Sequence, residues 1–415
     1  MNKIILRIVL LILFSTVVSI AQVNPLEKIL NENKDKFGHV IENPDSFEVQ
    51  IIYTQINRDK NNFPKLTTHK YNVNPKNYFY PASTVKLPLA ILALEKLNSL
   101  KIAGLNKFTP IRIDSNVVKQ SCLFADTSSV TGIPSIAHLI KKLFLVSDND
   151  SYNYLYEFLG QKGINKTLHN KGYKDVKIVH RFVSGLSAEE NSRTNTVDFY
   201  SGEKIIYHQP SLINTEEYPT ALNKLQKGIG YLNAKDSLVN KPFDFSQKNY
   251  ISLETLTDLL KAIIFPEAVP AKMRFNLTSD DYKFLYKYMS MFPRESKYPG
   301  YDTSHFDGYV KYFLFGDSHK KAQGNIRSFD KVGLAYGYLT DIAYIIDFKN
   351  KIEFMLSATI LVNKDGIFND NKYEYNQIGL PFLANLGRAV YNYELNRTKN
   401  HLPDLSKFNI NYVSE

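Results

Sequence analysis

The chain has 415 residues, of which 44% are hydrophobic and 22% are charged, and its formal net charge is +10. This length and apolar content exclude a disordered or fibrous chain and suffice for one large domain with a sizeable core. The single cysteine, Cys122, excludes an intramolecular disulfide, and we interpret it as a structural residue that packs as a small apolar group.

Residues 1–21 have the pattern of a secretory signal peptide. Lys3 and Arg7 form a positive start, residues 8–20 are mostly apolar, and the stretch ends in Ser-Ile-Ala, with small residues where a signal peptidase cuts. The apolar run is shorter than the about 20 residues of a membrane-spanning helix. We therefore expect cleavage, although an uncleaved anchor is the alternative, and a mature chain of residues 22–415 that is secreted or periplasmic and has no membrane span.

Hydrophobic periodicity predicts the elements that follow in chain order. We expect helices over residues 25–37, 83–97, 135–145, 151–159, 253–264, 280–291 and 380–395. We expect strands over residues 47–53, 328–331, 342–348 and 352–361, and an extended aromatic segment over residues 77–80. Residues 200–250 and 292–325 are polar or rich in turn residues, which indicates two insertions.

The distribution of these elements predicts the fold class. Strands lie near both ends of the chain and helices fill the middle, which indicates an α/β plus all-α fold in which an antiparallel sheet is flanked by the terminal helices. The sheet subdomain is expected over residues 22–82 and 326–415, and the inserted helical lobe over residues 83–325. We expect the active cleft between the two.

The first chemical signal is Ser83-Thr84-Val85-Lys86 at a predicted helix start. Residues three apart share one face of a helix, so the Lys86 amine can reach the Ser83 hydroxyl. An alcohol becomes a good nucleophile when a neighbouring base takes its proton. Backbone N–H groups at a helix N-terminus also favour the negative charge that develops during attack on a carbonyl.

Two further signals follow in the chain. Ser147-Asp148-Asn149 lies between two predicted helices, where it would also serve as a turn and an N-cap. Lys331-Val332-Gly333 ends a predicted strand, where the lysine can attract a carboxylate and the glycine allows close approach of a substrate. Each tripeptide alone is weak evidence.

In this order the three signals resemble the S-x-x-K, S-D-N and K-T-G set of class A β-lactamases and penicillin-binding proteins. Gly337-Tyr338-Leu339-Thr340-Asp341-Ile342-Ala343 is similar to that family's G-x-x-x-D-I-A strand, and the resemblance covers roughly residues 45–395. It implies a β-lactamase/transpeptidase-like fold and an acyl-enzyme mechanism. In that mechanism Ser83 is the nucleophile, Lys86 its activating base, and Ser147 the group that protonates the leaving nitrogen.

The resemblance also implies how the substrate binds. Asn149 would hold the side-chain amide of the substrate, and Lys331 would attract its carboxylate. Gly333 would let the substrate lie close to the strand. The backbone N–H groups of Ser83 and Leu334 would form the oxyanion hole, and Asp148 is expected to be a scaffold residue.

Two departures from the family pattern concern the substrate and the second chemical step. Val332 replaces the K-T-G threonine and cannot donate a hydrogen bond to a carboxylate. Class A enzymes deacylate with a glutamate from an E-x-x-L-N loop, whereas the corresponding loop here, residues 181–196, contains only Glu189 and Glu190. We name both as candidates for the catalytic deacylating group, with solvated loop charges as the alternative.

Three functions therefore stay open. The first is a β-lactamase that hydrolyses a small β-lactam, the second a D-alanyl-D-alanine peptidase or penicillin-binding protein that acts on cell-wall peptides, and the third a β-lactam binder without turnover. The nine histidines show no metal-binding spacing, so we expect no metal and no cofactor. Lysines are spread along the chain, so we expect no nucleic-acid partner, and we expect a monomer.

Overall fold

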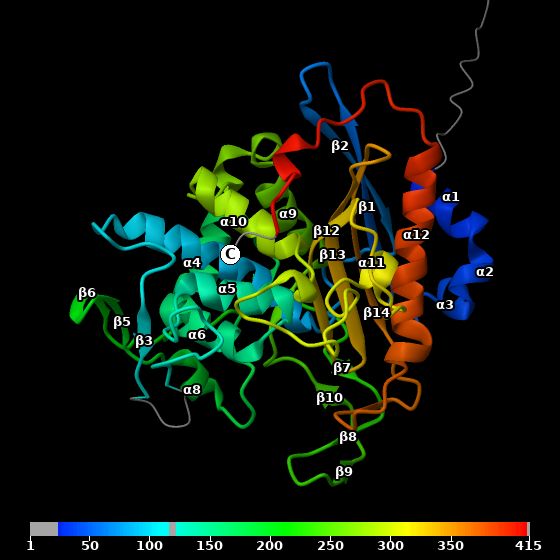
Figure 1. Cartoon of the computed structure of the whole chain (residues 1–415). Helices are drawn as coiled ribbons and strands as arrows, with labels where there is room; N and C mark the ends of the chain where they lie inside the picture. Colours follow the sequence, from blue (N-terminus) through cyan, green and yellow to red (C-terminus); the bar gives the residue numbers. More distant parts are fainter. Residues whose placement is uncertain (1–23, 116–121, 413–415) are drawn as a thin grey trace, which may run out of the picture.

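The computed structural model describes residues 24–115 and 122–412 (Figure 1). The predicted signal peptide, residues 1–21, lies outside the described residues. In the part of the chain that is described, no helix combines the length and the apolar character needed to cross a bilayer.

A five-stranded antiparallel sheet with the order β12-β13-β14-β1-β2 forms one half of the molecule. Its strands are β1 (Gln50–Arg58), β2 (Pro64–Tyr71), β12 (Ile326–Ala335), β13 (Tyr338–Asp347) and β14 (Ile352–Leu361). Strand β1 pairs with β14, so the two ends of the chain close a single sheet. This confirms the predicted antiparallel sheet built from both termini.

The terminal helices cover one face of this sheet, as predicted (Figure 1). They are α1 (Pro25–Glu32), α2 (Lys34–Phe37), α3 (His39–Glu42) and α12 (Leu380–Asn396). Side chains alternate across the sheet: Ile51 and Tyr53 pack on the terminal helices, whereas Ile52 and Ile56 pack toward the helical lobe. The sheet therefore separates two apolar clusters.

The helical lobe surrounds a central buried helix, α4 (Lys86–Leu100). The longer helices around it are α5 (Ile136–Leu145), α6 (Asn149–Leu159), α7 (Gln161–Lys171), α9 (Leu253–Ile264) and α10 (Ser279–Ser290). Helix α4 is apolar nearly all round, as a helix enclosed by neighbours should be. Pro88 is accommodated because it lies in the first turn, where backbone N–H groups have no partner within the helix.

The first predicted insertion, residues 200–250, contains short strands and no helix. These strands are β6 (Lys204–Gln209), β7 (Gln226–Lys227), β8 (Gly230–Leu232), β9 (Leu238–Val239), β10 (Phe243–Asp244) and β11 (Tyr250–Ile251). Strands β8 and β9 project from the lower end of the molecule, below the junction of sheet and lobe (Figure 1). The insertion therefore lies where it can border a cleft.

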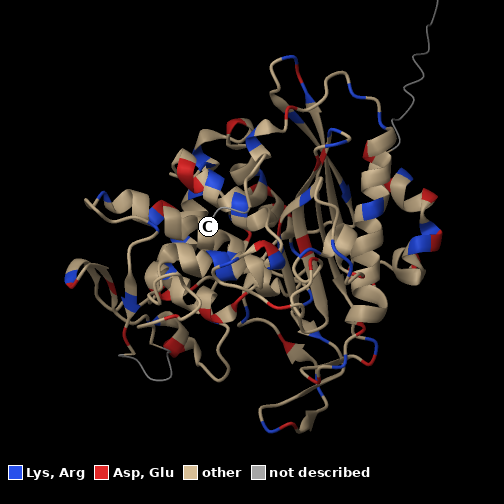
Figure 2. Cartoon of the chain, viewed as in Figure 1, with Lys and Arg blue, Asp and Glu red and all other residues tan. Residues whose placement is uncertain are grey.

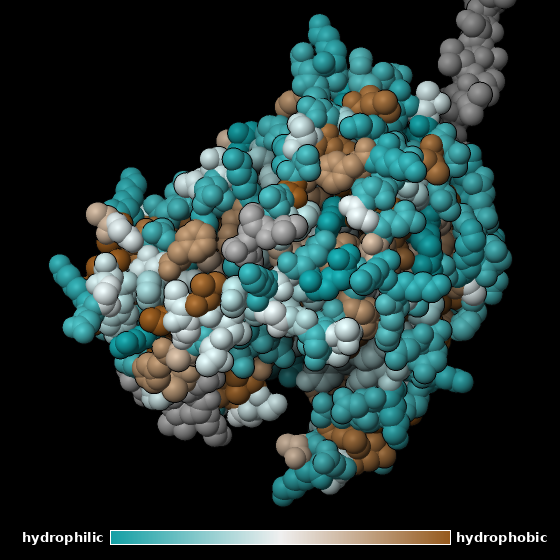
Figure 3. Space-filling view, in the orientation of Figure 1, coloured by the Kyte–Doolittle hydropathy of each residue, from teal (hydrophilic) through white to brown (hydrophobic). Residues whose placement is uncertain are grey.

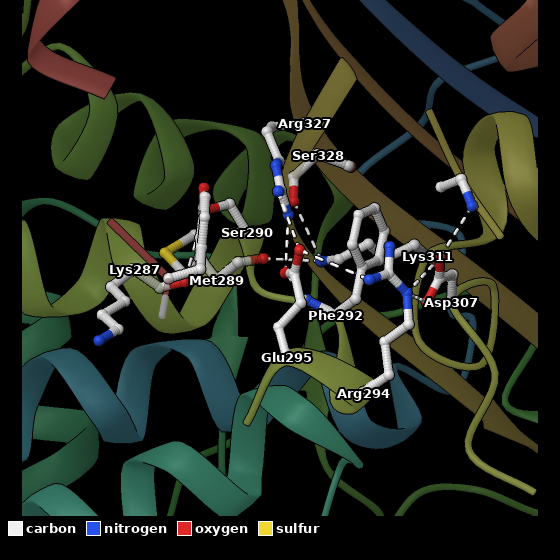
Figure 4. A network of polar contacts seen from close by, with 12 residues as sticks. Lys287, Met289, Ser290, Phe292, Arg294, Glu295, Asp307, Lys311, Arg327 and Ser328 are labelled. Atoms are coloured by element: carbon white, nitrogen blue, oxygen red, sulfur yellow. Dashed lines mark hydrogen bonds and ion pairs between the residues drawn. The ribbon is translucent and has the colours of Figure 1, made fainter. Parts of the chain in front are cut away.

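The second predicted insertion, residues 292–325, packs along the open edge of β12 (Figure 4). Lys311 Nζ donates to the Ser328 carbonyl at 3.0 Å, and Arg327 forms two hydrogen bonds of 2.8 and 2.9 Å with the Glu295 carboxylate. Unpaired edge strands tend to pair with other chains, and a covering segment prevents this. These contacts, together with the one between Lys311 and Asp330, lie before the residues predicted to bind substrate.

The structure corrects the interpretation of Cys122, whose side chain is exposed. The neighbouring Leu123 bridges to Ile113 and takes the buried position. Because successive side chains of an extended segment point to opposite sides, Cys122 faces outward.

Candidate active site

Ser83 lies in a tight turn that leads directly into the central helix. The 3₁₀ helix η1 (Ala82–Val85) precedes α4, and the backbone N–H of Lys86 donates to the Ser83 carbonyl. Ala82 has a φ of 45°, a conformation that non-glycine residues adopt mainly where their surroundings impose it. The turn holds the half-buried Ser83 at the N-terminal end of a buried helix.

Gly333 brings the end of β12 into contact with this turn. A Cβ atom at Gly333 would lie 2.5 Å from the Pro81 carbonyl oxygen and 3.1 Å from the Ser83 backbone nitrogen. The first of these distances is shorter than real carbon–oxygen contacts, so only glycine permits this approach. The predicted nucleophile and the predicted substrate-binding strand are therefore direct neighbours.

Ser147 lies in the loop that joins α5 to α6, with a φ of 58°. Asp148 caps α6 by accepting the N–H of Ser151 at 2.7 Å, which is the scaffold role expected of it. The loop turns the Ser147 hydroxyl toward two lysine side chains.

The first of these lysines is Lys86, which is fully buried. Its Nζ donates to Asn149 Oδ1 at 2.7 Å and to Ser147 Oγ at 3.3 Å, and also to the Ser147 carbonyl. Burial lowers the pKa of Lys86 well below its usual value, and the charge on Lys331 lowers it further, whereas Asp148 raises it. A low pKa makes the neutral amine, which can accept a proton, accessible near neutral pH.

The second is Lys331, on the face of β12 that looks toward the helical lobe. Its Nζ donates to Ser147 Oγ at 2.9 Å and to the Val332 carbonyl at 2.9 Å. Burial lowers the pKa of Lys331 to about 7, and Asp330 and Asp341 partly oppose this change. Lys331 therefore changes its charge within the physiological range of pH.

The backbone of β12 is oriented so that the Leu334 N–H is directed away from β13. The Val332 carbonyl accepts from Lys331 Nζ, so the backbone polar groups of Val332 point away from β13. In an antiparallel pair, residues two apart point their backbone groups to the same side, so the Leu334 N–H also points out of the sheet edge. Because Gly333 touches the Ser83 backbone, the neighbouring Leu334 lies close to the turn that carries the Ser83 N–H.

Glu189 and Glu190 both form contacts within their own loop. Both belong to the short helix α8 (Ala188–Ser192). Glu189 is exposed and pairs with Arg193 at 2.7 Å, and Glu190 accepts the N–H of Ser187 at 2.8 Å in a capping box. These contacts favour the alternative interpretation, in which both carboxylates are charges of the loop and not the deacylating group.

A carboxylate that the motif search missed holds this loop in place. Glu157 on α6 is buried and accepts Arg181 Nε at 2.9 Å through one oxygen and the Asn195 N–H at 2.7 Å through the other. The loop of residues 181–196 is thus clamped at both ends by one side chain. A glutamate within the apolar pattern of α6 was the available signal, because a buried carboxylate needs a partner.

Phe182, also missed by the motif search, covers Lys86 from the same loop. Its ring centroid lies 5.2 Å from Lys86 Nζ, and its backbone N–H donates to Asn153 Oδ1 at 2.8 Å. The loop therefore presents an aromatic face, not an acid or base, to the Lys86 amine. Among the described residues no group of three histidine, cysteine, aspartate or glutamate side chains is placed to hold a metal ion.

Comparisons with known proteins give the family context. The model of a β-lactamase enzyme family matches residues 26–279 of this chain. No sequence among the curated proteins matches.

Several solved structures of β-lactamases are similar to the chain. One from Xanthomonas campestris is 14% identical, with 89% of this chain and 97% of that chain covered and a TM-score of 0.46. One from Sphaerobacter thermophilus is 11% identical and one from Chitinophaga pinensis is 12% identical. Each of these two covers 89% of this chain and 99% of its own, with a TM-score of 0.48.

The family model spans well over half of the chain, including the segments that carry Ser83, Lys86 and Ser147. The chain therefore belongs to the β-lactamase enzyme family.

Proposed function

We propose that this protein is an exported serine hydrolase that cleaves an amide through an acyl-enzyme at Ser83, with a β-lactam as the first candidate substrate. One observation carries the proposal: the amines of Lys86 and Lys331 both contact Ser147 Oγ, at 3.3 and 2.9 Å. The Ser83 turn lies directly before Lys86 and against Gly333. The Ser147 hydroxyl and the two amines thereby lie beside the turn that carries Ser83, which supports the proposal.

In the acylation step, Ser83 Oγ attacks the carbonyl carbon and its proton passes to the neutral Lys86 amine. The new oxyanion accepts the N–H groups of Ser83 and Leu334. The low pKa of Lys86 supports its role as the base, because an amine that is charged at neutral pH could not take the proton.

The tetrahedral intermediate then expels the leaving nitrogen. Ser147 donates its proton to that nitrogen and recovers one from Lys86, which contacts both Ser147 Oγ and Asn149 Oδ1. Lys331 attracts the carboxylate on the leaving-group side. Ser83 remains bonded to the acyl group, and water must remove it in a second step.

A second candidate, a peptidase or penicillin-binding protein that acts on cell-wall peptides, is favoured by the loop of residues 181–196. Glu189 and Glu190 have other partners, and Phe182 is the residue that this loop places over Lys86. Slow removal of a β-lactam acyl group separates binding proteins from β-lactamases. The Lys86 amine is then the base available for hydrolysis of a natural acyl-enzyme.

Time-resolved mass spectrometry of the intact protein with a penicillin tests these proposals. We expect a mass increase equal to the whole β-lactam on the peptide that contains Ser83, and none in the Ser83→Ala variant. Loss of the adduct within seconds supports a β-lactamase. An adduct that persists, together with cleavage of a cell-wall-type peptide, supports the second candidate, and persistence without peptide cleavage supports a binder.

Absence of any adduct with the folded wild-type protein would refute the acyl-enzyme proposal. The Ser99→Ala variant is a suitable control, because it removes a hydroxyl from helix α4 but from none of the three motifs. Export is tested separately by sequencing the N-terminus of the protein recovered outside the cytoplasm, which we expect to begin at Gln22.

A further inference from the structure

The order of the residues along the edge of β12 predicts how a bound substrate is oriented. Ser147 and Lys331 serve the leaving group, and Lys331 lies before Gly333 on the strand. The opposite direction along the edge leads past Leu334 to Tyr336, in the turn between β12 and β13. A substrate laid along this edge therefore extends its acyl-donor part toward Tyr336.

A large cavity begins at that point. Its volume is about 1140 Å³, and Tyr80, Phe182 and Tyr336 line it. Tyr80 lies three residues before Ser83, and the Phe182 ring faces Lys86, so the cavity borders the reaction centre. Its volume exceeds the about 300–1,000 Å³ that is usual for small-molecule sites.

The insertion of residues 200–250 builds the outer wall of this cavity. Residues 214–220, 231–234, 243 and 246–248 contribute to the lining. The space-filling view shows the molecule hollowed at its lower side, between the helical lobe and the projecting β8–β9 segment (Figure 3). The inserted segment thus forms one wall of the cavity, and residues 179–186 contribute to the other side.

One side of the cavity is aromatic. The rings of Phe243 and Tyr336 lie 5.5 Å apart, those of Tyr80 and Tyr336 5.1 Å apart, and those of Tyr231 and Phe243 5.2 Å apart. Such a wall offers a large apolar surface with fixed geometry. It favours a ligand with substantial apolar area over a compact polar one.

The same side carries two lysines. Lys248 Nζ lies 5.8 Å from the Phe243 ring centroid and 5.7 Å from that of Tyr336, and no carboxylate of the described residues pairs with it. Lys177 Nζ donates to the Ser246 carbonyl at 2.8 Å, which places it beside the segment that carries Lys248. The Lys248 ammonium group therefore lies at the cavity wall and can donate hydrogen bonds to a ligand.

The acidic residues of the lining lie on another segment. Glu216 pairs with Lys162 at 2.7 Å, and Glu217 is exposed beside it. Figure 2 shows basic and acidic residues interspersed along the ribbon, so the local pairing matters more than the net charge of +10. The aromatic side of the cavity is its cationic side.

We propose that this cavity binds the acyl-donor part of the substrate, and that its occupant is a peptide segment of several residues whose side-chain carboxylate pairs with Lys248. The proposal rests on the acyl-enzyme function proposed above and, of its two candidates, specifies the one that acts on peptides. An extended peptide can add to the free edge of β12 through its backbone and pass into the cavity, which is a common mode of peptide recognition. The aromatic wall then packs against its apolar groups.

Isothermal titration calorimetry on the Ser83→Ala variant tests the proposal without turnover. The probes are N-acetyl pentapeptides with one glutamate moved along the sequence, each with a matched glutamine peptide. At one or two positions we expect the glutamate peptide to bind about tenfold more tightly, because a hydrogen bond between two charged groups is stronger than a neutral one. This preference should disappear in a second variant that adds Lys248→Gln and persist in one that adds Lys248→Arg.

Lys241→Gln in the same background is the matched control, because Lys241 is exposed on the same insertion and does not line the cavity. We expect it to keep the preference. Equal affinity for glutamate and glutamine peptides at every position, or a preference that survives Lys248→Gln, overturns the proposal. A failure of the acyl-enzyme proposal would be detected separately, by mass spectrometry, as the absence of a Ser83 adduct in the wild-type protein. The calorimetric result does not affect that measurement.

Discussion

Lys331 donates a hydrogen bond to Ser147 Oγ at 2.9 Å and so joins the edge strand of the sheet to the loop before α6. The same oxygen lies 3.3 Å from Lys86 Nζ, and the charge on Lys331 is one of the causes of the low pKa of Lys86. On the proposed mechanism, protonation of Lys331 therefore affects both the attraction of a substrate carboxylate and Lys86, the base proposed to activate Ser83.

The pKa of Lys331, about 7, predicts a pH-dependent Michaelis constant. As the pH rises through about 7, Lys331 loses its proton and with it the positive charge that attracts the substrate carboxylate. We expect KM for a carboxylate-bearing substrate to rise about tenfold on the alkaline side, since one ion pair is lost. The measurement is kcat and KM at a series of pH values on both sides of 7.

An ester analogue without the carboxylate is the control for this prediction. Its KM should stay constant through the same range, because no ion pair with Lys331 forms. A parallel rise of KM for both substrates would show that a group other than Lys331 controls binding.

Elements with a regular hydrophobic pattern could be predicted from the sequence almost to the residue. Helix α9 and strand β14 begin and end at the expected positions. Strand β2 and helix α7 were missed because most of their residues are polar, and contacts with neighbouring elements stabilise them. The prediction of β12 covered only part of the strand, because pairing with β13 extends it through Gly333, a residue with low strand propensity.

For the candidate active site, the sequence predicts the motif residues but not the arrangement of the loop of residues 181–196. Three short motifs locate Ser83, Ser147 and Lys331, because each motif is set by local spacing. The positions of Glu189 and Phe182 depend on how the loop of residues 181–196 folds, and a buried contact from a distant helix sets that fold. Such a long-range contact leaves no local pattern in the sequence.

Gly333→Ala tests the contact between β12 and the nucleophile turn. The added methyl group would meet the Pro81 carbonyl at 2.5 Å and the Ser83 nitrogen at 3.1 Å, so strand and turn must separate. We expect acylation to slow by about a hundredfold, because a displacement of about 1 Å has that effect on a positioned nucleophile. We also expect about 1–3 kcal/mol lower stability, as for other overpacked sites.

Gly324→Ala is the matched control, since a Cβ at Gly324 meets nothing within 4 Å. Acylation rates come from the mass assay and stabilities from urea unfolding. Normal acylation in a folded Gly333→Ala protein would show that the close approach has no functional importance.

Glu157→Gln should destabilise the loop of residues 181–196 and the protein as a whole. The substitution leaves the buried Arg181 guanidinium without its carboxylate, and breaking a buried ion pair in this way costs about 3–5 kcal/mol. Proteolysis within the loop should become faster. Glu189→Gln, which removes only an exposed pair with Arg193, should change neither unfolding nor the rate at which an acyl group is lost.

His180 predicts a loss of stability in acid. Its Nδ1–H donates to the Arg181 carbonyl at 2.8 Å, its ring stacks on Tyr80 with centroids 6.4 Å apart, and burial lowers its pKa to about 4. The unfolded chain, with a histidine pKa of about 6.5, binds the proton more readily than the folded chain. Stability should therefore decrease as the pH falls from about 6.5 toward about 4, by up to about 3 kcal/mol from this residue.

Urea unfolding at several pH values, for the wild-type protein and His180→Gln, measures this contribution as the difference between the two pH profiles. His208→Gln serves as the comparison, because His208 is exposed and paired with Asp198 at 2.6 Å, so its removal should leave the acid-side loss of stability in place. The stability of His180→Gln should decrease less steeply below about pH 6.5. In this variant, position 180 binds no proton in the unfolded or in the folded chain. Identical slopes for His180→Gln and the wild-type protein would mean that the stacked imidazole takes up its proton without unfolding, and that the acid sensitivity comes from other buried groups.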